Sequence, residues 1–292
     1  MKMRIYTRCI LLTAFLMIIF QSDLFSQGTD LSVERNRGLF IGLSSGPMQS
    51  KILNEGTSAI SNMTSANKYS FFGSLEFGYF ITRSIGITSG VGYNVYKGLL
   101  SLSSYQDNHT AIDEDNESYE QRVSASGVQE LQSIGYLSVP VCLAFRLPIG
   151  EKAGVFVQAG ADVTLPMKKN YESSGIFTYK GYYSAYNVLL EDMPQHGFPS
   201  NYSSNTEGDL ELKSLGFNLL ASAGFDFSLS QKLQLAIGGA FDKSLSSISQ
   251  YTSTDEFQLS SEVDQINSMM GGSSKATTQL ISLKIVLRYY FR

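Results

Sequence analysis

Apolar and polar residues alternate along this chain with a period of two, the pattern of a β-strand whose two faces meet different surroundings. In the last segment, residues 280–292, Leu283 and Ile285 share one parity while Lys284 and Arg288 share the other. Seven more segments alternate in the same way: residues 38–46, 69–81, 85–95, 136–146, 153–165, 214–229 and 233–245. The pattern therefore predicts eight β-strands.

The connections between these segments alternate in length. Tight turns are predicted near 82–84, 147–152 and 230–232, and long polar loops at about 47–68, 99–127, 168–213 and 246–276. Short turns on one side, long loops on the other and an even number of strands are typical of bacterial outer-membrane barrels. Strands of this length also match the roughly 9–11 residues that a tilted strand needs to cross a bilayer.

We therefore expect an all-β fold: a closed, eight-stranded, antiparallel transmembrane β-barrel with short periplasmic turns and long extracellular loops. The alternative is a soluble sandwich or lipocalin-like barrel, which would bury its apolar parity and show charges outside. The second parity here consists mostly of Gly, Ser, Thr, Asn and Ala, with a few single charges. Small polar residues suit the narrow interior of an eight-stranded barrel, so the pattern favours the membrane barrel.

The first 26 residues have the features of a secretory signal peptide. Lys2, Arg4 and Arg8 precede an apolar core at 10–20, which is too short for the roughly 20 residues of a spanning helix. We expect Sec-type export, cleavage after Ser26, a short periplasmic segment at 27–36 and the barrel at 37–292, in the outer membrane.

Composition and charge exclude several classes of function. Only 16% of the 292 residues are charged, and removal of residues 1–26 leaves 19 cations and 25 anions, which argues against a nucleic-acid partner. Cys142 is then the single cysteine, so neither an intramolecular disulfide nor a cysteine metal site is expected. No cofactor is expected either.

Three segments carry a resemblance to a known family. "FGYFITRSIGITSGVGY" (77–93), "GYLSVPVCLAFRLP" (135–148) and "VFVQAGADV" (155–163) resemble the PorT-like outer-membrane β-barrels of Bacteroidota. The resemblance implies a small eight-stranded barrel, and it transfers no activity, because the family is functionally mixed and the long loops depart from its compact members. Pro140 cannot donate to a strand ladder, so we expect a β-bulge there.

Charged residues on the inward parity are expected to form a network of ion pairs in the lumen, because a buried charge is costly unless it is paired. Glu76 is expected to approach Lys284 or Arg288, with Gly42 leaving room between them. The full set is Glu76, Arg146, Asp162, Asp226, Asp242, Lys284 and Arg288.

The long loops hold the remaining candidates. Aromatic residues favour contact surfaces, and the candidate surface-contact residues are Tyr171, Phe177, Tyr179, Tyr182, Tyr183 and Tyr186. His109 and His196 are expected to be solvated loop residues, and the acidic run 113–118 lacks the Gly and Glu positions of an EF-hand calcium loop.

These observations predict an outer-membrane protein with a structural or surface-interaction role, without catalysis and without a catalytic, cofactor or metal site. Its expected partners are outer-membrane lipid, the assembly machinery that reads the aromatic-rich C-terminal strand, and an unknown surface or membrane protein. Two alternatives stay open: an outer-membrane enzyme acting on lipid A, and a narrow porin-like solute channel.

Overall fold

The computed structural model describes residues 38–56, 60, 62–251 and 257–291; the expected signal peptide and the segment 27–36 lie outside them. These residues form a ten-stranded antiparallel sheet. Its strands are β1 (Gly38–Gly56), β2 (Met63–Phe80), β3 (Ile85–Ile112), β4 (Ser118–Ile149), β5 (Ala153–Tyr183), β6 (Val188–Leu190), β7 (Tyr202–Asp209), β8 (Gly216–Ser228), β9 (Leu233–Ser244) and β10 (Ser273–Tyr290). The described residues also form the 3-10 helices η2 (Pro194–His196) and η3 (Met269–Gly272). Within the described ranges, no helix has the length and hydropathy needed to span a membrane.

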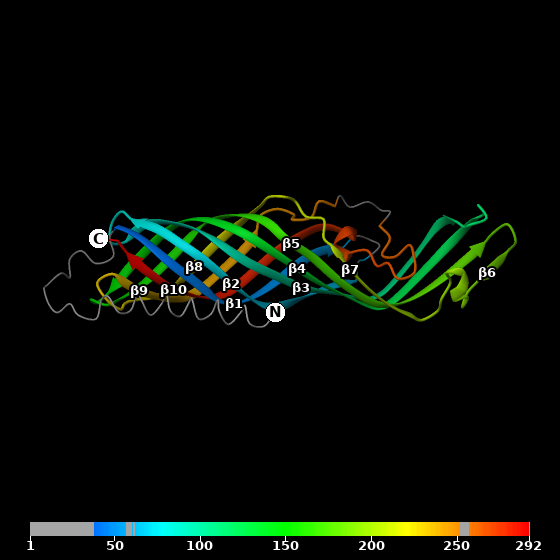
Figure 1. Cartoon of the computed structure of the whole chain (residues 1–292), viewed down its shortest axis with the longest axis horizontal. Helices are drawn as coiled ribbons and strands as arrows, with labels where there is room; N and C mark the ends of the chain where they lie inside the picture. Colours follow the sequence, from blue (N-terminus) through cyan, green and yellow to red (C-terminus); the bar gives the residue numbers. More distant parts are fainter. Residues whose placement is uncertain (1–37, 57–59, 61, 252–256, 292) are drawn as a thin grey trace, which may run out of the picture.

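Eight strands pair into a ring (Figure 1). The pairing runs β1–β2–β3–β4–β5–β8–β9–β10 and returns from β10 to β1, where Gly42 lies opposite Arg288. The eight predicted strands are all present, and the expected pairing of the last strand with the first is confirmed. β6 and β7 both pair with β5 outside this ring.

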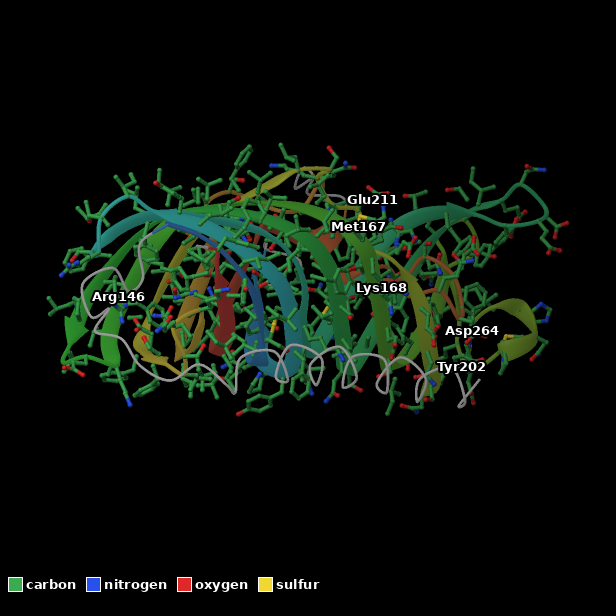
Figure 2. The ribbon with its side chains drawn as sticks, turned by 60° about the vertical axis from the view of Figure 1, so that its left-hand side comes forward. Arg146, Met167, Lys168, Tyr202, Glu211 and Asp264 are labelled. Carbon is green, nitrogen blue, oxygen red and sulfur yellow. The ribbon has the colours of Figure 1, made fainter. Side chains whose placement is uncertain are left out.

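The apolar parity points outward along the ring, as predicted. Leu43 and Phe77 are 51% and 44% exposed, whereas Ser44 and Glu76, next to them in sequence, are 1% and 6% exposed. The continuous row of outward apolar side chains on β5 ends at Met167, and from Lys168 onward the outward residues are charged or polar except Ile176, which is 47% exposed. In Figure 2, Met167 and Lys168 lie midway along the molecule, between Arg146 near one end and Tyr202 toward the other. We call the part with outward apolar side chains the apolar belt.

The tight turns lie where they were predicted, at one end of the ring. The Thr82 hydroxyl accepts hydrogen bonds from the backbone N–H groups of Ser84 (3.2 Å) and Ile85 (2.9 Å), which closes the β2–β3 turn. The Ser230 hydroxyl does the same for Lys232 and Leu233 between β8 and β9.

The long segments are mostly strand, which corrects the prediction of loops at 47–68, 99–127 and 168–213. β3 and β4 continue to a short turn at 113–117, and β5 continues to Tyr183 with β7 paired along it. These stretches lack an outward apolar parity, so the alternation that identified the other strands is missing there. Their pairing is instead favoured by backbone hydrogen bonds and by inward apolar residues such as Leu102 and Val123.

Pro140 does not lie at a β-bulge, which was the prediction. β4 keeps one register with β3 on both sides of it, Ser89 opposite Val141 and Gly92 opposite Ser138. The Ser89 hydroxyl donates to the Pro140 carbonyl at 2.9 Å. The β3–β4 hydrogen-bond ladder is therefore interrupted locally at Pro140, and β4 has no extra residue of the kind that a bulge would insert there.

Candidate functional site

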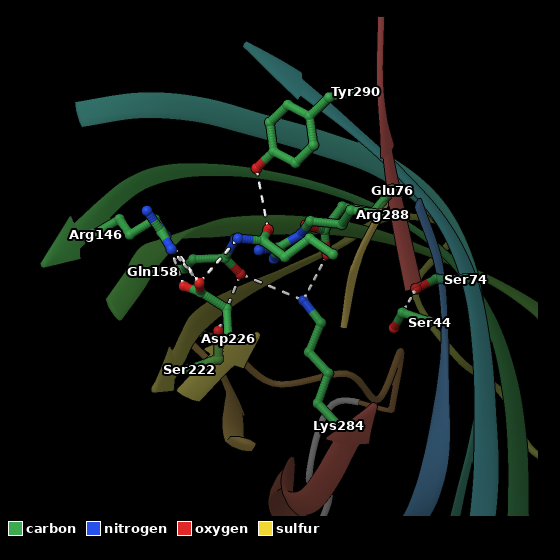
Figure 3. Close-up of polar contacts among 11 residues, drawn as sticks. Ser44, Ser74, Glu76, Arg146, Gln158, Ser222, Asp226, Lys284, Arg288 and Tyr290 are labelled. Carbon is green, nitrogen blue, oxygen red and sulfur yellow. Dashed lines mark hydrogen bonds and ion pairs between the residues drawn. The ribbon is translucent and has the colours of Figure 1, made fainter. Parts of the chain in front are cut away.

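The interior of the ring is filled by polar contacts near the end that carries the tight turns (Figure 3). Arg146 on β4 donates to both carboxylate oxygens of Asp226 on β8, with Nε at 2.9 and 2.8 Å. Gln234 on β9 donates to the same carboxylate at 2.9 Å. Asp226 is fully buried and Arg146 is 4% exposed, so this pair is shielded from water.

Glu76 on β2 contacts two cations from β10, across the intervening strand β1. Its carboxylate lies 2.8 Å from Lys284 Nζ and 2.8 Å from Arg288 Nη2. A Cβ at Gly42 would lie 3.1 Å from Arg288 Cγ, so the absence of a side chain there leaves room for the guanidinium to pass. Glu76 was expected to approach Lys284 or Arg288, and it contacts both.

The other two inward carboxylates take no part in these ion pairs. Asp242 accepts hydrogen bonds from the Tyr96 hydroxyl and the Asn218 amide, both at 2.8 Å. Asp162 lies opposite Pro140 on β4 and Asn218 on β8. The seven predicted residues all point into the ring: Arg146 pairs with Asp226, Glu76 pairs with both β10 cations, and Asp162 and Asp242 take no part in these ion pairs.

Above the apolar belt, the segment 257–272 fills the mouth of the ring; we call it the plug. Leu259, Ile266 and Met269 pack in one buried cluster with Phe177 and Tyr179 of β5. Met270 belongs to a second buried cluster with residues of β1, β3 and β4. The plug therefore joins the outer parts of the long strands through an apolar core.

Glu130 on β4 anchors the plug, and the sequence analysis missed it. Its carboxylate accepts hydrogen bonds from Gln132 Nε2 (2.6 Å), Ser173 Oγ (2.9 Å), Ser268 Oγ (2.9 Å) and the Met269 N–H (2.7 Å). Burial raises the pKa of Glu130, and these four hydrogen bonds act against that shift. Its parity continues the inward parity of 136–146, which is the signal that could have identified it.

The candidate surface aromatics divide into buried and exposed residues. Phe177 and Tyr179 are fully buried in the cluster under the plug, so a surface contact by them is excluded. The reason is that β5 is a strand at this height, with its alternate residues facing inward. Tyr171 is half-buried, and its hydroxyl donates to the Ile266 carbonyl at 3.0 Å.

Three tyrosines lie at the far end of the extended strands. The hydroxyls of Tyr183 and Tyr186 donate to Asp113 (2.9 Å) and Glu117 (2.7 Å) in the β3–β4 turn. Tyr182 donates to Asn187 at 3.0 Å. These bonds tie the β3–β4 turn to the segment after β5, and Tyr186 remains 61% exposed.

Four apolar side chains are exposed at this end of the strands, and we call this end the tip. Its exposed side chains are Ile112, Tyr186, Val188 and Leu189, at 69%, 61%, 43% and 42%. The acidic run forms the adjoining turn, in which Asp113 Oδ1 accepts from the N–H groups of Asp115 and Glu117. Among the described residues, no group of three or more His, Cys, Asp or Glu side chains is arranged to hold a metal ion.

One of the two histidines departs from the expected solvated loop position: His109 lies in a strand, whereas His196 is exposed in the segment between β6 and β7. His109 is part of β3, where Nδ1 lies 3.3 Å from Asp107 Oδ2, and His196 ends η2. β3 runs from Tyr93, an exposed belt residue, to His109 over roughly 50 Å at about 3.3 Å per residue. His196 lies two residues before Phe198, whose ring packs on Tyr119 near the outer end of β4, so both histidines stand well beyond the apolar belt.

A family model matches this chain, and several solved structures of low similarity align with it. The family model described as outer membrane protein beta-barrel domain matches residues 25–250. Neisserial surface protein A is 9% identical, with 87% of this chain and 97% of that chain covered and a TM-score of 0.36. OprG from Pseudomonas aeruginosa is 12% identical over 90% of this chain and 100% of that chain, with a TM-score of 0.38. Ail from Yersinia pestis is 12% identical over 87% and 99%, with a TM-score of 0.31. No curated protein matches this chain.

Proposed function

The chain belongs to the family of outer membrane protein beta-barrel domains, which places it in the outer membrane, and we propose that it anchors an ordered surface β-sheet there. In this proposal the ring is a closed barrel without a solute path. The tight turns face the periplasm, and the extended strands stand outside the cell. We assign it to the PorT-like group of Bacteroidota on the resemblance of segments 77–93 and 135–148.

One observation carries the proposal: β3, β4 and β5 continue as paired strands far beyond the apolar belt. β3 covers roughly 60 Å between Tyr93 and Ile112 at about 3.3 Å per residue, and β4 stays paired to β3 as far as Ser118. β4 also pairs with β5 as far as Tyr182. A mobile loop would lose conformational freedom on binding, whereas a sheet that is already ordered loses little.

The tip is the surface that we assign to contact. An exposed patch of aliphatic and aromatic side chains costs solubility unless something covers it, and such patches mark interaction sites. Ile112, Val188 and Leu189 supply the apolar area, and Tyr186 supplies an amphipathic ring that is held in place by Glu117. The partner is therefore a surface with an apolar area of matching size, either on the same cell or outside it.

The interior gives little support to a channel. The ion pairs fill the ring at one end, the plug fills it at the other, and Arg288 and Tyr290 are 1% and 2% exposed. The lipid A enzyme is likewise not favoured, because His109 and His196 stand far above the belt. Planar-bilayer recordings should accordingly give no steps above the membrane background, and discrete single-channel steps would favour the channel.

Site-directed labelling tests the orientation. Asn116→Cys at the tip and Gln231→Cys in the β8–β9 turn, each in a Cys142→Ser background, are treated on intact cells with a membrane-impermeant maleimide. We expect Asn116→Cys to react on intact cells and Gln231→Cys to react only after the outer membrane is permeabilised. The reverse result would place the sheet in the periplasm and overturn the proposal.

Photo-crosslinking tests the contact itself. A photoreactive amino acid at Ile112 is compared with one at Ser104, which is also exposed on β3 but lies away from the tip. We expect a discrete adduct from position 112 only, and Leu189→Ser should weaken it. Equal adducts from both positions, or none from position 112, would contradict a contact surface at the tip.

A further inference from the structure

A cavity of about 80 Å³ lies inside the ring, and three charged side chains line it. They are Asp162 on β5, Asp242 on β9 and Lys284 on β10. Hydroxyl and amide groups line another part of the wall, among them those of Asn94, Ser138 and Ser222, and apolar side chains such as Phe72 and Leu220 line the rest. A single water needs roughly 10–15 Å³ of such space, so the cavity has room for an ion with part of its hydration.

The charges of this interior do not balance. The cations of the seven-residue set are Arg146, Lys284 and Arg288, and the anions are Glu76, Asp162, Asp226 and Asp242. Arg146 pairs with Asp226, and both β10 cations pair with Glu76. The carboxylates of Asp162 and Asp242 are left over, and the set as a whole carries one negative charge too many.

These two carboxylates differ in how their oxygens are satisfied. Asp242 is 3% exposed and has two donors, the Tyr96 hydroxyl and the Asn218 amide. Asp162 is 2% exposed and is hydrogen-bonded by Ser138 and the backbone of Val139, but its Oδ1 has no hydrogen-bond partner among the described residues. A buried carboxylate oxygen without a hydrogen-bond partner is costly, and a bound cation would remove that cost.

We propose that the cavity binds one monovalent metal cation, with Na⁺ as the natural occupant, at the free oxygen of Asp162. Hard cations prefer oxygen ligands, and the Asp242 carboxylate with the side-chain oxygens of Asn94 and Ser138 completes such a set. One positive charge balances the seven-residue set, whereas a divalent ion would overcharge that set beside Lys284. The ion would join β3, β4, β5 and β9 at the height between the ion pairs and the plug.

Equilibrium dialysis of the purified protein in detergent against ²²Na⁺ tests the site directly. The wild-type chain should retain one Na⁺ per molecule, and Asp162→Asn should retain none. Asp264→Asn, which removes a carboxylate in the plug far from the cavity, should bind as the wild type does. If Asp162→Asn does not fold, Asp242→Asn takes its place with the same expectation.

Unfolding in urea gives a second readout. In NaCl against choline chloride of equal ionic strength, the wild-type unfolding constant should fall about tenfold for each tenfold rise in Na⁺ above its dissociation constant. This dependence should vanish in Asp162→Asn and persist in Asp264→Asn. A wild-type chain that retains no Na⁺ would overturn the proposal and leave a proton as the neutralising charge. Undiminished binding in both Asp162→Asn and Asp242→Asn would also overturn it.

Discussion

Glu76 gives the sharpest test of the interior, because it is the single carboxylate bonded to both β10 cations in the described part of the ring. The change Glu76→Ala leaves Lys284 and Arg288 facing each other without that anion, at exposures of 14% and 1%. Removing one partner of a buried ion pair typically costs about 3–5 kcal/mol. Arg288 is almost completely enclosed between Phe40 and Phe156, at 5.2 and 5.5 Å from their rings. We therefore expect a loss of about 4 kcal/mol in the free energy of unfolding, which is roughly a thousandfold in the equilibrium constant.

The matched variant removes the cations as well. Glu76→Ala combined with Lys284→Met and Arg288→Met leaves no uncompensated charge, so its loss should be about 2 kcal/mol or less. Urea unfolding in detergent micelles, followed by far-UV circular dichroism, measures both variants, because the chain has no tryptophan for fluorescence. Glu172→Ala, an exposed carboxylate on β5, serves as the control and should stay within about 0.5 kcal/mol of the wild type. A triple variant as unstable as Glu76→Ala, or a double-mutant cycle without coupling, would refute this reasoning.

Three further predictions concern close packing and the plug. A Cβ at Gly160 would lie 2.0 Å from the Val141 carbonyl oxygen, so Gly160→Ala should lower the free energy of unfolding by about 1–3 kcal/mol in the same assay. Gly73 has open space around it, so Gly73→Ala should be neutral. Equal effects of the two changes would contradict the close approach of β4 and β5. Glu130→Ala removes the acceptor of four hydrogen bonds, so protease cleavage within 257–272 should rise at least tenfold while the ring stays resistant. Unchanged cleavage would show that the packing of the plug does not depend on Glu130. Burial raises the pKa of Glu130 above its ordinary 4.5, so the protein with the plug packed binds the Glu130 proton more tightly than the protein with the plug released. Protection of the wild-type plug from protease should therefore be greatest below about pH 4.5 and should fall as the pH rises through the raised pKa. This pH dependence should be absent in Glu130→Ala.

The strands of the apolar belt could be predicted because lipid-facing and inward residues obey a strict alternation. Leu283 and Lys284 show the rule within two positions, since one must be apolar and the other must fit a polar interior. The approach of Glu76 to β10 followed from the same parity together with the height of each residue above its turn. Once a ring is assumed, the parity of each strand and its register with its neighbours can be deduced from the local sequence.

The outer half could not be predicted in the same way. At 103–112 the outward residues face water, so Gln106 and Asn108 carry no apolar signal and the stretch resembles a loop. Its order comes from β4, from β5 and from the plug, which lie far away in the sequence. Tyr179 was assigned to the surface for the same reason, although its hydroxyl lies 2.7 Å from Ser260 Oγ in the buried core. The pairing among the seven charged residues likewise depends on side-chain reach across the ring, which no local pattern encodes.

Hydrogen exchange along β4 tests most directly whether the protein carries an ordered sheet beyond the membrane. The stretch Tyr119–Ser126 is paired to β3 throughout and to β5 from Glu120 onward, so almost every backbone N–H in it is engaged. In the folded protein in micelles, mass spectrometry should find these amides protected for at least minutes, comparable with the belt stretch 141–146 of the same strand. Complete exchange of 119–126 at the earliest time point, with 141–146 still protected, would mean that the outer half is a mobile loop and would contradict the account.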